Sequence, residues 1–146
     1  RAQLSQRSNE RYLDALACVD VEPTLAQTMA PVCRRTTLQG RSVRALNPLS
    51  AEDACLLEAA SRGEYSIHGF RNRDLREQLF AATTALTAHQ QTTRVTRLIR
   101  MLRAHGLVRK VPHTHRYMVT RHGQTAAAAL LAARAANTRK LSELAA

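Results

Sequence analysis

Apolar residues recur along this chain mostly at spacings of three and four, which is the period of an α-helix with one buried face. Helices are predicted from this period and from the capping residues beside it. The first two occupy residues 3–18 and 23–33, the second with Pro23 at its start. The others follow the N-caps Ser50, Asn72, Thr92 or Thr93, and Thr120, with stop signals at Gly63 and Gly106.

Two short stretches rich in β-branched and aromatic residues predict extended structure between these helices. The segment "YSIHGF" predicts either one small strand or an extended connector. The segments "VRKVP" and "RYMVT" bracket "HTH", and this arrangement predicts a β-hairpin. Side chains alternate along a strand, so Tyr117 and Val119 should face inward while Arg116 and Met118 face outward.

The segment "RRTTLQGRSVRALNP" has no clear period and ends in a turn signal, which favours a domain boundary near Asn47. We therefore divide the chain into an N-terminal helical extension at residues 1–46, a central domain at 47–123 and a C-terminal helix at 124–146. The chain begins at Arg1 without an initiator methionine, so the extension is expected to be the end of a longer region. The expected fold class is mainly α with a small β-hairpin.

The helix that follows Thr92 separates apolar from basic residues most completely. At about 100° per residue, its aliphatic residues share one arc: Val95, Leu98, Ile99 and Leu102. The opposite arc and its flank carry only hydroxyl groups and cations: Thr93, Arg94, Thr96, Arg97, Arg100 and Arg103. One side of this helix is therefore expected to face the core and the other to face an external anion.

The basic face of this helix lies in a part of the chain that has no acidic residue to balance its charge. Residues 1–77 hold 11 basic and 10 acidic residues, whereas residues 78–142 hold 11 basic residues and no acidic one. Like charges one helical turn apart repel, and a solvated helix face usually mixes both signs. Arginine scattered at random by a GC-rich genome would account for its abundance, but not for the missing Asp and Glu. The formal net charge of +11 predicts a polyanionic partner, with nucleic acid first.

Several classes of function find no support in the sequence. No apolar stretch approaches the roughly 20 residues of a membrane span, so no membrane partner is expected. Cys18, Cys33 and Cys55 lack C-x-x-C spacing, and we expect buried, reduced thiols in a cytoplasmic protein. His113 and His115 have no Cys or carboxylate in this half of the chain, so no metal is expected. No nucleotide-binding or hydrolase motif occurs, and we expect neither enzyme activity nor a cofactor.

The order of helix, short strand, helix, arginine-lined helix, hairpin and helix resembles a winged helix-turn-helix domain. The resemblance covers residues 50–123 and is carried mainly by "RVTRLIRMLRAHGLVRKVPHTHRYMVT". It is of the broad kind found in bacterial transcriptional regulators such as the MarR and ArsR groups. The segments "GFRNRDLR" and "VPHTHRY" also resemble bacterial proteins found near mobile elements. The chain departs from the pattern between the two helices of the motif, where roughly ten residues replace the usual tight turn.

This resemblance implies binding of double-stranded DNA by a transcriptional regulator or a mobile-element protein, with the arginine helix in the major groove. The expected base contacts come from Thr93, Thr96, Arg97 and Arg100. The expected phosphate contacts on the same helix come from Arg94 and Arg103. The wing would follow the neighbouring backbone or minor groove through Arg109, Lys110, His113, His115 and Arg116. The start of the preceding helix would add phosphate contacts from Arg71, Asn72 and Arg73.

Three alternatives stay open: a winged helix used for protein contacts, one used for RNA, and the DNA-binding part of a longer enzyme. With three tyrosines, two phenylalanines and no tryptophan, the chain has few aromatic platforms for single strands, which favours duplex DNA. Regulators of this kind commonly form homodimers. The helices at 3–18 and 124–144 carry apolar stripes that the central domain leaves unused, so they are the candidate dimer interface.

Overall fold

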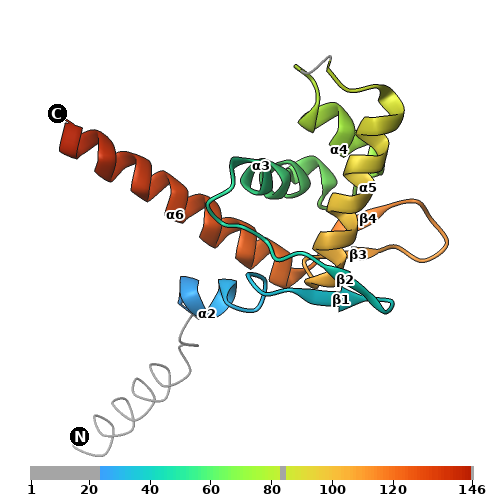
Figure 1. Ribbon diagram of the computed structural model, residues 1–146, viewed down its shortest axis with the longest axis horizontal. Coiled ribbons are helices and arrows are strands. Elements are labelled where there is room, and N and C mark those ends of the chain that lie inside the picture. The colour runs from blue at the N-terminus through green and yellow to red at the C-terminus, as the bar shows by residue number, and fades with distance from the viewer. Residues whose placement is uncertain (1–23, 83–84, 146) are drawn as a thin grey trace, which may run out of the picture.

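The structure, a computed structural model, describes residues 24–82 and 85–145, and the predicted helix at 3–18 lies outside them. The elements are α2 (Leu25–Met29), β1 (Thr36–Leu38), β2 (Arg41–Val43), α3 (Ala51–Ala60), η1 (Gly63–Tyr65), α4 (Asn72–Leu79), α5 (Ala88–Ala104), β3 (Val108–Lys110), β4 (Tyr117–Val119) and α6 (Arg121–Ala145). Helix α6 starts among the other elements and runs well beyond them to the C-terminus (Figure 1). The fold is mainly α with two antiparallel β-hairpins.

The hairpin formed by β1 and β2 was not predicted from the sequence. Its strands pair antiparallel in the register Thr36↔Val43, Thr37↔Ser42 and Leu38↔Arg41. The two turn residues, Gln39 and Gly40, both have positive φ, 51° and 73°, which suits the tight turn that matches strand twist. Each strand has only 3 residues, so alternation of apolar and polar side chains was too brief to be recognised.

Helix α3 begins as predicted, because the Ser50 hydroxyl accepts a hydrogen bond from the Asp53 N–H at 3.4 Å. The Asp53 side chain has another partner. It is 1% exposed and accepts two hydrogen bonds from the Arg44 guanidinium group, at 2.7 and 2.8 Å. It also accepts one from the Asn47 N–H at 2.8 Å. This carboxylate therefore fastens the segment after β2 to the first turn of α3.

The segment "YSIHGF" forms a connector, which was one of the two structures predicted for it, and not a strand. It contains the end of the 3₁₀ turn η1, a further turn and one β-bridge between Phe70 and Tyr117. The predicted N-cap Asn72 is wrong by one residue. Helix α4 starts after Arg71, whose N–H donates to the Asp74 carboxylate at 2.7 Å. Asn72 is thus inside the helix, where its side chain can reach α5.

Helix α5 starts more than one turn before the predicted caps Thr92 and Thr93. Its N-cap is Thr87, whose hydroxyl accepts from the Gln90 N–H at 3.2 Å while the Gln90 side chain accepts from the Thr87 N–H at 2.9 Å. The residues before Thr92 are polar and carry no apolar period, which hid this first part of the helix. The predicted inward face is confirmed, and Met101 joins it: Val95, Leu98, Ile99, Met101 and Leu102 are buried.

The predicted second hairpin is confirmed as β3 and β4, paired in the register Val108↔Val119, Arg109↔Met118 and Lys110↔Tyr117. Tyr117 and Val119 pack against the core as expected. Gly106, with a φ of 70°, turns the chain out of α5. Thr120 caps the last helix as predicted, since its hydroxyl accepts from the Gly123 N–H at 3.0 Å.

One hydrophobic core joins these elements. It includes the most deeply buried side chains of α3 to α6, among them Leu56, Leu75, Leu102 and Ala126. The N-terminal part contributes to the same cluster through Met29, Val32, Val43 and Leu46. Residues 24–46 therefore share a core with the rest of the described chain, and the domain limits given above stay a prediction.

The cysteines are less buried than expected. Cys33 is half-buried and Cys55 is exposed, and Cys18 lies outside the described residues. Burial raises the pKa of the Cys33 thiol above its ordinary value. Over residues 24–82 and 85–145, no helix is both long and apolar enough to cross a bilayer.

Candidate nucleic-acid interface

The outward face of α5 presents hydroxyl and guanidinium groups. Thr96 and Arg97 are exposed, and Thr93 is half-exposed. The hydroxyls of Thr93 and Thr96 donate to carbonyls one turn earlier, at 3.0 and 2.9 Å, and the Thr96 hydroxyl also accepts from the Asn72 amide at 3.0 Å. Each hydroxyl keeps acceptor capacity but has no further proton to donate. Within the part of the chain that the structure describes, the Arg97 guanidinium group forms no ion pair. Arg97 is thus the group on this face that can donate to an anionic ligand.

Arg94, on the flank of α5, already has an anionic partner. Its Nη2 and Nε both donate to Oε1 of Glu52, at 2.7 and 3.1 Å. The external anion expected for this side of the helix is therefore replaced at Arg94 by a carboxylate of the protein itself. The acid comes from the first turn of α3, 42 positions away in the sequence, so a charge count by segment could not reveal it. Both side chains are about half exposed, and such a pair contributes little on its own.

Arg100 is partly engaged by the first hairpin. Its Nη2 donates to the carbonyl oxygen of Leu38 in β1 at 3.2 Å. Arg103, one turn further on, is half-buried. Of the four residues predicted to contact bases, Thr93, Thr96 and Arg97 lie on the open half of α5. Arg100 lies where the β1–β2 hairpin packs against the helix.

The start of α4 is tied directly to the face of α5. The Asn72 amide donates to the Thr92 carbonyl at 3.2 Å and to the Thr96 hydroxyl at 3.0 Å. Arg76, one turn further along α4, donates to the Thr92 hydroxyl at 3.2 Å. These bonds fix the spacing of the two helices across the connection at 80–87. Asn72, expected to meet phosphate, thus positions one helix against the other.

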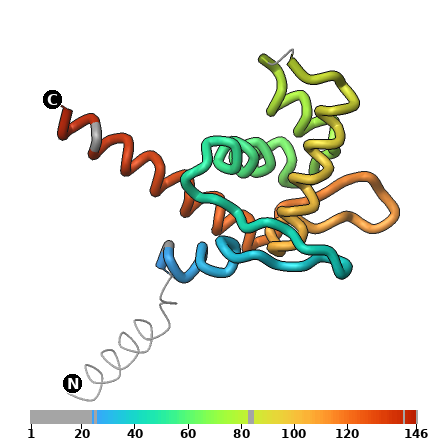
Figure 2. The backbone as a smooth tube through the Cα atoms, viewed as in Figure 1, coloured from blue at the N-terminus to red at the C-terminus, as the bar shows by residue number. Residues whose placement is uncertain are grey.

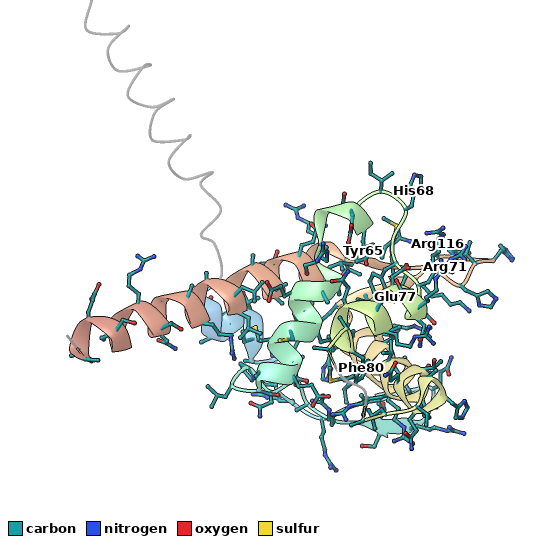
Figure 3. The ribbon with its side chains drawn as sticks, turned by 90° about the horizontal axis from the view of Figure 1, so that it is seen from above. Tyr65, His68, Arg71, Glu77, Phe80 and Arg116 are labelled. Atoms are coloured by element: carbon teal, nitrogen blue, oxygen red, sulfur yellow. The ribbon has the colours of Figure 1, made fainter. Side chains whose placement is uncertain are left out.

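The bridge between Phe70 and Tyr117 brings the start of α4 next to the β3–β4 hairpin. Their backbones exchange two hydrogen bonds of 2.8 Å, and the Phe70 ring packs against the rings of Tyr65 and Tyr117. Arg71 and Arg116 flank this bridged pair and lie near each other, as Figure 3 shows. The bridge therefore brings together two side chains, from separate parts of the chain, that were predicted to bind phosphate.

The other predicted wing residues are exposed: Arg109, Lys110, His113 and His115. Arg73 on α4 is exposed as well, with its Nε 4.0 Å from the Asp74 carboxylate. The loop between β3 and β4 has internal order, because the Thr114 hydroxyl donates to the Val111 carbonyl at 2.9 Å and accepts from the Arg116 N–H at 3.1 Å. Among the described residues, no three His, Cys, Asp or Glu side chains are grouped as a metal site.

A groove of about 670 Å³ follows the Arg94 flank of α5. Its lining includes His89, Arg94 and Arg97 from α5 and Arg44 from the segment after β2, with Glu52 as the one carboxylate. Arg44 was not among the predicted site residues. The available signal was that residues 24–51 contain four arginines and no acidic residue. That segment extends the basic surface beyond the region in which it was sought.

Comparison of the chain with protein-family models, with curated proteins and with solved structures finds no significant match. The chemistry of this surface is therefore inferred from its own side chains. Guanidinium, hydroxyl and imidazole groups from α4, α5 and both hairpins can donate hydrogen bonds to an extended anion.

Proposed function

We propose that the chain binds duplex DNA as a winged helix-turn-helix domain of a bacterial transcriptional regulator or mobile-element protein. Helices α4 and α5 would form the helix-turn-helix, with α5 in the major groove and the β3–β4 hairpin as the wing. The order α3, bridge, α4, α5, β3, β4 supports this assignment, as does the bond between Asn72 and Thr96. The observation that carries it is the open N-terminal half of α5 with Thr93, Thr96 and Arg97.

The chemistry of that half of α5 suits base recognition. A helix in the major groove reads base edges mainly with its N-terminal half, which is the half that the β1–β2 hairpin leaves uncovered. Arg97 can donate two hydrogen bonds to O6 and N7 of guanine. Arg71 and Arg116 would bind the phosphates beside the groove and fix the register. Such a protein would act on the chromosome in the bacterial cytoplasm.

The test of this proposal is Arg97→Ala, measured on a duplex selected from a random pool by the wild-type protein. Removing a bidentate arginine is expected to weaken binding by roughly 5- to 150-fold, which corresponds to about 1 to 3 kcal/mol. Fluorescence anisotropy of a labelled duplex at fixed salt gives the two dissociation constants. Arg139→Ala, on the exposed distal part of α6, removes the same charge and is the matched control.

The outcomes separate the proposed function from its alternatives. An equal loss in both variants would mean that only net charge matters, and α5 would not lie in a groove. Unchanged duplex binding by Arg97→Ala would favour a protein-contact role for this face. Tighter binding to single-stranded RNA than to the selected duplex would replace DNA by RNA as the partner.

The Glu52–Arg94 pair gives a second expected result. Glu52→Gln removes the charge that holds Arg94, so that arginine becomes available to a phosphate. We expect tighter binding to random duplex, and a slope of log K against log salt that is steeper by about 0.9, the value of one added phosphate contact. Glu58→Gln, on the exposed side of the same helix, is the control. Identical slopes for the two variants would mean that Arg94 stays clear of the backbone.

A further inference from the structure

The β1–β2 hairpin, residues 34–44, forms an arm at the same end of the molecule as the wing. The tube of Figure 2 traces both hairpins extending past α5 toward the same side. Seen from above in Figure 3, α5 lies between the wing and this arm. The three elements therefore form one continuous surface, with α5 in the middle.

The arm is held firmly against α5. The Leu38 carbonyl accepts from Arg100 at 3.2 Å near one end of the hairpin. At its other end, Nε2 of His105 lies 2.9 Å from the carbonyl oxygen of Arg44. Val43 of β2 is buried in the core. Because the arm is already ordered, little conformational entropy is lost when it contacts a ligand.

The chemistry of the arm is that of a phosphate-binding surface. Its exposed residues are all cationic, polar or glycine: Arg34, Arg35, Thr37, Gln39, Gly40, Arg41, Ser42 and Arg44, of which Arg44 is paired with Asp53. Arg41 is the cross-strand partner of Leu38, the residue whose carbonyl binds Arg100. A second arginine, from the arm, thus lies opposite the residue that binds Arg100, and no acidic residue occurs between positions 24 and 51. Like charges gathered without a carboxylate are stabilised by an external anion.

We propose that this arm binds the phosphate backbone of duplex DNA on the side of α5 opposite the wing. The inference rests on the proposed function, because it needs α5 in the major groove. Two phosphate backbones border that groove, and the wing reaches only one of them. The arm supplies arginine, threonine and glutamine side chains to the other, which are the usual donors to phosphate oxygens. The groove that continues along α5 is lined by Arg44 and Arg94, which are paired with Asp53 and Glu52, and by Arg97, which forms no ion pair among the described residues.

The test compares three variants of the full chain on a random duplex of ~30 base pairs, a length that exceeds one recognition site. The arm variant carries Arg34→Ala, Arg35→Ala and Arg41→Ala. The matched control removes the same charge from α6 by Arg134→Ala, Arg139→Ala and Lys140→Ala. The third variant replaces the arm arginines with lysine, which keeps the charge. The slope of log K against log salt is measured for each, together with thermal melting to verify the fold.

The arm variant is expected to flatten the slope by roughly 2 to 3 and to weaken binding at ~0.1 M salt by at least tenfold, since each phosphate contact contributes about 0.9 to the slope. The lysine variant should keep the slope. In a hydroxyl-radical footprint on a duplex that the wild-type protein selects from a random pool, the arm variant should lose protection at one edge of the site, and Arg109→Ala with Lys110→Ala at the opposite edge.

Three results would overturn the arm assignment. One is an arm variant with the same slope as the α6 control, and another is loss of slope in the lysine variant. The third is a footprint that both hairpin variants shorten at the same edge. If the wild-type protein itself shows no salt-dependent duplex binding, the proposed function fails. If the wild type binds duplex and only the arm variant is indistinguishable from it, the arm assignment alone fails.

Discussion

Gly123→Ala is expected to destabilise the protein by about 3 kcal/mol and to lower its melting temperature by roughly 10 °C. Gly123 lies in the first turn of α6, against the chain that leaves α5. A Cβ atom at this position would overlap the carbonyl oxygen of Leu107 and would also press on the Val119 side chain. That carbonyl accepts the Thr120 N–H at 3.0 Å, so it cannot move without loosening the cap of α6. The substitution therefore forces α6 away from the end of α5 and from β4.

The sign of the effect makes this a sharp test. In an unobstructed helix, replacing glycine with alanine stabilises by up to about 1 kcal/mol, so a variant that melts above the wild type would contradict the close approach of α6. Gly63→Ala is the control, because nothing lies within 4 Å of the Cβ atom it would add. Thermal melting followed by circular dichroism compares the three proteins. The control should melt within a few degrees of the wild type.

Asp53→Asn is expected to cost about 1 to 2 kcal/mol at neutral pH, because it removes hydrogen bonds to a charged, buried carboxylate, while the Arg44 side chain that it leaves is 46% exposed and can be hydrated. The carboxylate accepts from Arg44 and from the Asn47 N–H, and it is almost completely buried. The amide cannot accept on both oxygens and adds N–H donors next to a guanidinium group. Glu58→Gln, exposed on the same helix, should change the free energy of unfolding by less than about 0.5 kcal/mol.

The same carboxylate should make the stability depend on pH. Burial tends to raise the pKa of Asp53, but the hydrogen bonds from Arg44 and Asn47, and the charge of Arg44, outweigh it and lower the pKa. Because the folded-state pKa lies below the unfolded value of about 3.9, the stabilisation is complete above that value and is lost as pH falls through the folded-state pKa. Urea unfolding from neutral to acidic pH should therefore show a smaller acid loss in Asp53→Asn than in the wild type. Parallel curves would contradict this assignment.

The helical periods identified the parts of the fold that bury a continuous apolar face. The inward side of α5, the β3–β4 hairpin and the cap at Thr120 all follow from neighbouring residues, and these were predicted correctly. The first hairpin was missed because its strands are short and its burial depends on α5. The start of α5 was missed because polar residues form its first turn, which only the capping pair Thr87 and Gln90 marks.

The candidate site could be predicted as a set of residue types, but its contacts could not. The outward position of Thr93, Thr96 and Arg97 follows from the helical period. The bond from Arg94 to Glu52 joins residues far apart in the sequence, so no local pattern reveals it. The same holds for the meeting of Arg71 with Arg116, which depends on the bridge between their neighbours.

The clasp between Asn72 and Thr96 has a consequence for how this chain can vary. Because side-chain hydrogen bonds hold α4 against α5, the angle between the two helices does not depend on the residues that connect them. Lengthening a surface connection costs only a few tenths of a kcal/mol in closure entropy. Insertions there are therefore expected to be tolerated while the asparagine and the threonine are kept. Such a connection can diverge or acquire new segments without disturbing the surface it leads to.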